Sequence, residues 1–184
     1  MLGWWPTFVK DRPMADATSR SAAVPRADRP GIPAEYGASK ATEFVDWRHV
    51  EDRLTADRVY WIATVGRDGR PRVRPVDGVY VDGAIYVGGS PETRWVQEVA
   101  ANPHVSLHLD GIDDVVIVDG EAEILAGVAD DELARRLAHA SNAKYPEYRM
   151  KPDFYKANGA IAIRLRKVIS WTDISKDPTR FLFD

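Results

Sequence analysis

A strong hairpin signal between residues 59 and 76 constrains the fold of this chain more than any other feature. Residues 59–65 form a compact run of branched and aromatic side chains, and residues 70–76 form a second run of strand type. The Asp68-Gly69 pair between them favours the positive backbone angles of a hairpin turn. Further strands are expected at residues 79–81, 84–87, 105–109, 115–125, 160–166 and 168–171. Because these strands follow one another through short turns, they predict an antiparallel barrel.

Helical patterns interrupt the run of strands and predict helices appended to the barrel. Ser39 offers an N-cap for a helix over residues 40–55, in which apolar residues recur at three- and four-residue spacing. A second helix is predicted over residues 92–101, before Asn102-Pro103, and a third over residues 130–142.

The first part of the chain has a different composition. Between residues 11 and 36 it is rich in Pro, Ala, Arg and Ser, and its prolines are spaced so closely that no helix fits between them. We therefore predict an N-terminal arm or linker over residues 1–38 and a single domain over residues 39–184.

Composition excludes several functional classes. A net charge of −3 argues against a protein that coats nucleic acid, because such proteins carry a basic excess. The sequence has no cysteine, which excludes disulfides and thiolate chemistry and fits a reducing cytoplasm. The N-terminal apolar stretch is too short to span a membrane, and the histidines lack the spacing of metal ligands. No Gly-x-Ser-x-Gly motif of a hydrolase occurs.

Three segments together carry a resemblance to a known family. They are residues 63–76 with their Asp-Gly turn, residues 86–107 with Gly88-Gly89-Ser90 and Thr93-Arg94 before a helix, and residues 171–183. In order and spacing they resemble the pyridoxamine 5'-phosphate oxidase family, which includes oxidases using FMN and many proteins using the deazaflavin coenzyme F-420. The resemblance covers residues 42–184. It implies a mainly β fold with helices, a six-stranded antiparallel Greek-key split β-barrel, and a homodimer with the cofactor in the groove between subunits.

Helix-terminus chemistry and the resemblance together predict where the cofactor binds. A helix N-terminus offers amide donors and partial positive charge, so residues 90–94 are the expected phosphate seat, with Arg94 adding a charge-assisted bond. Arg72 and Arg74 alternate with Val73 on a strand and therefore share one face. The resemblance implies that Trp171 lies beside the cofactor of the other subunit. The expected cofactor-binding residues are Arg72, Arg74, Val76, Gly88, Gly89, Ser90, Thr93, Arg94, Trp171 and Arg180.

Each of these residues also has an ordinary structural interpretation, and the sequence departs from the family at two positions. Paired arginines often lie on a solvated sheet face, a Ser or Thr at a helix start is usually a cap, and Gly-Gly after a strand is usually a turn. Trp95 follows Arg94 where FMN oxidases have a lysine, and Val115 stands where they place a glutamine near the ring. The first departure puts the usual FMN-phosphate clamp in doubt.

The resemblance implies an oxidoreductase that uses FMN or F-420 to transfer a hydride to or from a small organic substrate, and the composition favours a cytoplasmic location. Neither a catalytic side chain nor a metal site is identified, and neither a nucleic acid nor a membrane is an expected partner. Two alternatives remain open. The first is a true pyridoxamine 5'-phosphate oxidase, and the second is a non-catalytic carrier of a cofactor or haem on the same barrel.

Overall fold

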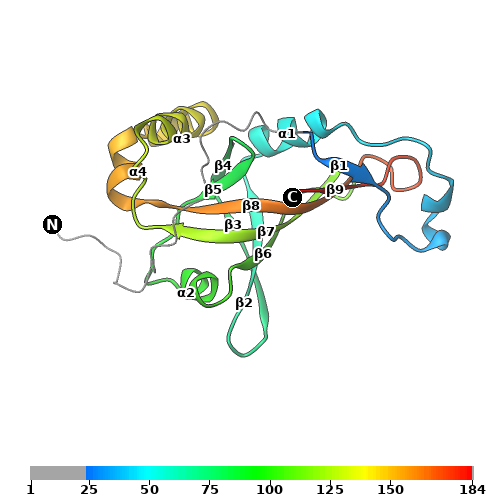
Figure 1. The fold of residues 1–184 in the computed structure, drawn as a ribbon, viewed down its shortest axis with the longest axis horizontal. Coiled ribbons are helices and arrows are strands. Elements are labelled where there is room, and N and C mark those ends of the chain that lie inside the picture. Colours follow the sequence, from blue (N-terminus) through cyan, green and yellow to red (C-terminus); the bar gives the residue numbers. More distant parts are fainter. Residues whose placement is uncertain (1–23, 184) are drawn as a thin grey trace.

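The computed structural model describes residues 24–183, in which one antiparallel sheet of nine strands is flanked by four α-helices (Figure 1). The strands are β1 (Arg26–Asp28), β2 (Tyr60–Val65), β3 (Pro71–Val76), β4 (Gly78–Val81), β5 (Ala84–Val87), β6 (His104–His108), β7 (Val115–Leu125), β8 (Ala160–Trp171) and β9 (Thr179–Leu182). The helices are α1 (Trp47–Ala56), α2 (Arg94–Ala101), α3 (Asp131–Lys144) and α4 (Pro152–Asn158). Single 3-10 turns occur at Ala34–Tyr36, Ala38–Lys40 and Pro146–Tyr148.

The long strand β8 organises the sheet. The strands follow the order β1-β9-β8-β7-β6-β2-β3, and β8 pairs with β7 along almost its whole length. On its other edge, residues 161–164 of β8 pair with β5, whereas residues 167–170 pair with β9. Two elements thus share one edge of β8, with β4 paired to β5 as a hairpin. The predicted mainly β split barrel with appended helices is confirmed. Its sheet has nine strands where six were predicted, because β1 and β9 extend the seven strands β2 to β8.

Two apolar clusters fill the space beside the sheet. The larger lies among α1, α2 and the barrel strands, where Leu54, Ile62 and Val96 are each almost fully buried. The smaller packs α3 and α4 against the β4–β5 hairpin and includes Leu137 and Tyr155. Figure 1 shows α3 and α4 on one side of the sheet and α2 near the β2–β3 hairpin, away from β1 and β9.

The helix predicted over residues 40–55 begins later than expected. It starts at Trp47 because Asp46 is its N-cap, whose carboxylate accepts a hydrogen bond from the Arg48 amide at 2.9 Å. The preceding segment is tied to the sheet instead, since the Val45 amide donates to Thr179 Oγ1 at 2.8 Å. The long-range bond to β9 therefore overrides the local helical pattern.

Other predicted elements differ at their edges. The two strands predicted over residues 160–166 and 168–171 are one continuous strand, β8. The register shifts near the predicted break, because Asp119 pairs with Lys167 and Gly120 pairs with Leu165, which leaves one extra residue on β8. The sequence pattern did not predict α4, which begins at Pro152, nor β9, nor β1. Strand β1 lies within the predicted arm and pairs with β9.

The sheet presents two different faces. On β2, Tyr60, Ile62 and Thr64 are buried, whereas the alternating residues are only half-buried. Cross-strand register continues the second face across the sheet. One row consists of Pro75, Trp61, His108, Ile117, Ile169 and Arg180, and the next rows add Val73, Ala63, Val115 and Trp171. We call this second face the outer face. Its apolar side chains are partly exposed.

Strand β3 has a hydrogen-bonded neighbour on one side only in the described part of the chain, namely β2. The Gly66 amide donates to the Arg70 carbonyl at 3.1 Å, so by the alternation of an antiparallel ladder the even-numbered residues of β3 bond to β2. The backbone groups of Pro71, Val73 and Pro75 therefore point to the free edge. Because proline has no N–H, Val73 supplies the amide donor among these three.

Candidate functional site

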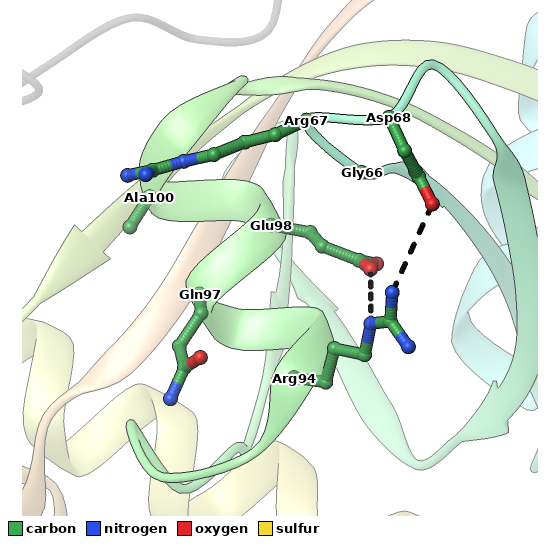
Figure 2. A pocket seen from close by; sticks show the side chains of 7 residues that line it. All are labelled: Gly66, Arg67, Asp68, Arg94, Gln97, Glu98 and Ala100. Atoms are coloured by element: carbon green, nitrogen blue, oxygen red, sulfur yellow. Dashed lines mark hydrogen bonds and ion pairs between the residues drawn. The ribbon is translucent and has the colours of Figure 1, made fainter.

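A cleft of about 610 Å³ lies between the β2–β3 turn and helix α2. It is lined by Gly66, Arg67 and Asp68 from the turn and by Arg94, Gln97, Glu98 and Ala100 from α2. Figure 2 shows the Arg94 side chain reaching from α2 toward Asp68, with the Glu98 carboxylate beside it and Arg67 extended toward Ala100. The cleft thus has Arg94, the residue predicted to bind phosphate, on one side and the turn of the β2–β3 hairpin on the other.

Glu98 is the centre of the charged groups at this cleft. Its side chain is only 7% exposed. Thr64 Oγ1 donates a hydrogen bond to Glu98 Oε2 at 2.7 Å, while Arg72 Nη1 and Arg94 Nε lie 2.8 and 3.2 Å from Oε1. The Thr64 hydrogen bond, followed by the charges of the nearby arginines, lowers the pKa of Glu98 despite its burial. Glu98 is therefore a fixed, ionised carboxylate.

The Arg72 guanidinium lies between two carboxylates. Its Nη2 is 2.9 Å from Asp68 Oδ2, in addition to the Nη1 contact with Glu98, and the Arg72 hydrogen bond lowers the pKa of Asp68. Gly66 makes this approach possible, because a Cβ at that position would lie 2.3 Å from Arg72 Nη1. A side chain at Gly66 would therefore displace the charged ends of Arg72 and Asp68 from their present positions.

Arg74 lies on the same face of β3 as Arg72, as the sequence predicted, while Val73 is exposed on the other face. The Arg74 guanidinium carbon is 5.8 Å from the ring centroid of Trp95. Its Nε atom is buried and has no hydrogen-bond partner among the residues that the structure describes. Arg74 therefore retains a buried donor that a ligand can use.

Trp95 belongs to the core. It is 7% exposed and packs beneath Gly89, where a Cβ would lie 2.5 Å from the indole ring. Gly88, in contrast, has open space at its Cβ position. The two predicted glycines thus differ, since Gly89 is required for packing against Trp95, whereas Gly88 leaves its backbone accessible.

The residues before α2 form a turn that leaves the helix start without a side-chain cap. Thr93 is the N-cap residue, but no side-chain cap hydrogen bond forms there. Its hydroxyl donates instead to the Ser90 carbonyl at 2.6 Å, and Ser90 Oγ accepts from the Glu92 amide at 3.3 Å. The amides of the first turn of α2 are therefore open to an external acceptor.

The structure divides the remaining predicted residues between two places. Val76 packs against the core beside β2, on the same face as Arg72 and Arg74. Trp171 and Arg180 lie on the outer face, at the ends of β8 and β9, and Arg180 is paired with Asp28 through Nε and Nη2 at 2.6 and 2.8 Å. Within one chain, Trp171 and Arg180 therefore do not join Arg72, Arg74 and Arg94.

Sequence reasoning missed Thr64, Gly66, Asp68 and Glu98. A signal for Glu98 was present, since it follows Arg94 by four residues on a helix, the spacing of neighbouring side chains. Asp68 and Arg72 are also four residues apart, but they lie in a hairpin. Their side chains meet there only because the turn is tight. The tertiary fold brings Thr64 next to Glu98, and no local sequence pattern indicates that contact.

A second group of titratable residues joins three elements away from the cleft. Lys144, in the last turn of α3, donates to the Leu54 carbonyl at 3.1 Å and to the Tyr60 hydroxyl at 2.8 Å. Its Nζ also lies 4.3 Å from the centroid of the Tyr60 ring. Burial lowers the pKa of Lys144 to about 8. Because Leu54 is near the end of α1, this lysine caps one helix from the end of another.

Residues 24–183 lack two kinds of feature. No group of three or more His, Cys, Asp or Glu side chains suited to a metal ion occurs in that range. None of its helices has both the length and the apolar character needed to cross a membrane.

Comparison with known proteins places the fold. The family model described as pyridoxamine 5'-phosphate oxidase matches residues 47–171. No curated protein sequence matches the chain. Among solved structures, a conserved hypothetical protein from Mycobacterium tuberculosis aligns over 72% of this chain and 87% of its own, with 23% identity and a TM-score of 0.56.

Two further solved structures share the fold. A FAD-binding protein from Mesorhizobium loti aligns over 76% of this chain and 96% of its own, with 23% identity and a TM-score of 0.52. General stress protein 26 from Bacillus anthracis aligns over 73% of this chain and 99% of its own, with 17% identity and a TM-score of 0.51. At these identities the similarity establishes a common architecture.

Proposed function

This chain belongs to the pyridoxamine 5'-phosphate oxidase family, and from that premise we propose that it is a flavin- or deazaflavin-dependent oxidoreductase of the cytoplasm. The observation that carries the proposal is the arginine cluster, by which we mean Arg72, Arg74 and Arg94 gathered around Glu98 beside the cleft. Such a cluster at a helix start suits a phosphorylated cofactor, because arginine is the preferred partner of phosphate oxygens.

Two features of these residues support a phosphate at this place. The open amides at the first turn of α2 point to an acceptor outside the chain, and Arg94 lies at the same helix start. The buried Nε of Arg74 lacks a partner within the described residues, a state that an incoming oxygen would relieve. Gly88 would let the cofactor approach the backbone, since nothing lies near its Cβ position.

The chemistry of the proposed reaction belongs to the cofactor, which when bound would exchange a hydride with a small organic substrate. The chain's own residues would hold and orient it. Arg94 and the first-turn amides of α2 would bind the phosphate of the cofactor. Arg74, next to Trp95, would hold the part of the cofactor that adjoins the phosphate. Trp95 is buried where FMN oxidases of the family have a lysine, which disfavours true pyridoxamine 5'-phosphate oxidase activity.

We further propose a homodimer that pairs through the outer face. This face is rich in partly exposed apolar side chains, among them Trp61, Ile117 and Ile169, and burying them against a second copy would be favourable. Since Trp171 and Arg180 lie on this face, a paired subunit could bring them to the cofactor held by the other chain. The partner subunit's Trp171 would then lie against the flavin or deazaflavin ring of that cofactor.

The test is a parallel titration of the purified protein with FMN and with F-420, followed by fluorescence. The Arg94→Ala variant should weaken the phosphorylated cofactor by roughly ten- to a hundredfold, the range for losing a hydrogen bond to a charged group. Arg135→Ala is the matched control, because Arg135 is similarly exposed and pairs with a glutamate on α3, outside the cleft. Unchanged affinity for both cofactors in Arg94→Ala would place the phosphate elsewhere.

A turnover assay then separates an enzyme from a carrier. Reduced cofactor on the protein should be reoxidised by an added acceptor at a rate that depends on the protein. Stable binding without such turnover would favour the carrier, the non-catalytic alternative on this barrel.

A further inference from the structure

We propose that Glu98 sets which kind of phosphate the site accepts, favouring a phosphodiester with one negative charge over a phosphate monoester with nearly two. This inference rests on the proposed cofactor site. It identifies Glu98 as a specificity-determining residue and names the ligand class as a monoanionic phosphodiester.

Glu98 is held firmly in the site. Both carboxylate oxygens are engaged, Oε2 by Thr64 Oγ1 at 2.7 Å and Oε1 by Arg72 and Arg94. The side chain is buried between β2 and α2, so a rotation into solvent would break all three contacts. A ligand phosphate therefore meets an ionised carboxylate that is already in place.

The arginines and carboxylates around Glu98 largely neutralise one another. Arg72 and Arg94 are compensated by Asp68 and Glu98, with which they form ion pairs of 2.8 to 4.0 Å. Arg74 remains as the inner cation with an unsatisfied buried donor in the described chain. Arg67 also lines the cleft, but it is exposed and extends toward Ala100 (Figure 2), so solvent screens its charge. One uncompensated inner charge next to a fixed carboxylate matches a ligand group that carries one negative charge.

Phosphate monoesters and phosphodiesters differ in their charge. A phosphate monoester carries about −1.5 to −2 near neutral pH, whereas a diester carries one charge because its second acidic oxygen is esterified. Repulsion from Glu98 and Asp68 scales with the ligand charge, and it is strong where water is partly excluded. The lowered pKa of Glu98 keeps the repulsion present at neutral pH. The monoester is therefore the disfavoured ligand.

The experiment uses a matched set of flavins on the full-length protein. FMN, the methyl ester of its phosphate and riboflavin share one ring and differ only in the phosphate, and binding is followed by flavin fluorescence. Wild type should bind the methyl ester at least about tenfold more tightly than FMN. Glu98→Gln, which keeps the shape of the side chain, should reduce this preference to less than about twofold by tightening FMN, with riboflavin unchanged.

The control is Glu132→Gln, since Glu132 is exposed on α3 and also pairs with an arginine. If Glu98→Gln does not fold, Asp68→Asn decides, because Asp68 is partly exposed in the turn and its loss should narrow the preference in the same direction. Equal binding of FMN and its ester by wild type, or an undiminished preference in the variant that folds, would overturn the inference.

Two further arms identify the source of the diester. F-420, whose phosphate is a diester, and FAD, whose pyrophosphate carries one negative charge on each of its two phosphates, are titrated in the same way, and tight binding of one of them names the source. Binding of flavins without any preference between FMN and its ester defeats only the role of Glu98. If neither the three flavins nor F-420 nor FAD binds wild type, the proposed function itself fails, and the inference with it.

Discussion

Replacing Lys144 with methionine should change how stability depends on pH. Lys144 donates to the Leu54 carbonyl and to the Tyr60 hydroxyl from a partly buried position, and its pKa is lowered to about 8 from the ordinary 10.5. Between these two values the unfolded chain holds a proton that the folded chain has released. The contribution of Lys144 to stability therefore rises with pH through this window and is lost as pH falls through about 8.

The size of the effect follows from the shift. One pKa unit corresponds to about 1.36 kcal/mol, so raising the pH from about 7 to about 9.5 would add roughly 2 kcal/mol for a fully buried group. Lys144 is partly open to solvent, and screening should reduce the gain to about 1 kcal/mol. Methionine has a similar length and no charge, so the Lys144→Met protein should lack this gain.

Urea unfolding followed by tryptophan fluorescence at the two pH values measures the effect. The quantity compared is the free energy of unfolding of wild type minus that of Lys144→Met, in which the titration of all other groups cancels. This difference should grow by about 1 kcal/mol from the lower to the higher pH. Lys151→Met, at the exposed start of α4, is the control variant. A difference that stays constant with pH would refute the reasoning.

Two further predictions concern the proposed dimer and its cofactor. Val73→Glu should convert the protein to a monomer in light scattering at micromolar concentration without lowering its thermal stability, because Val73 is 58% exposed on the outer face and a charge there would be buried on pairing. A wild type that is already monomeric would contradict the proposal. Trp171→Ala should weaken cofactor binding more than it lowers thermal stability, since its side chain lies on the outer face and only partly in the core. Loss of stability alone would make Trp171 a packing residue.

Much of the fold could be predicted where local and long-range preferences agree. The strand at Val115–Leu125 alternates buried and partly exposed residues over most of its length, and its predicted bounds match the structure. The helix α3 has Asp130 as a cap that accepts from the amides of Glu132 and Leu133, so its start could be found within one residue. The start of α1 was wrong because Val45 bonds to Thr179, a partner far along the chain.

The candidate site divides in the same way. Strand alternation correctly placed Arg72 and Arg74 on one face, since that inference needs only the two-residue period. Glu98 could not be assigned a role, because its importance comes from Thr64 and Arg72 on other strands. The relation of Trp171 and Arg180 to the cofactor stays a prediction, as it depends on contacts between two chains.

The prolines of β3 also bear on what happens when many copies of this protein are crowded together. An open sheet edge is a template on which foreign strands can add, and such addition is the first step of fibril growth. Along Pro71, Val73 and Pro75 an arriving strand would find a single amide donor, too few to start a ladder. The uncovered edge next to the cleft is thus a poor seed for aggregation, and a partner bound there would have to be recognised through side chains.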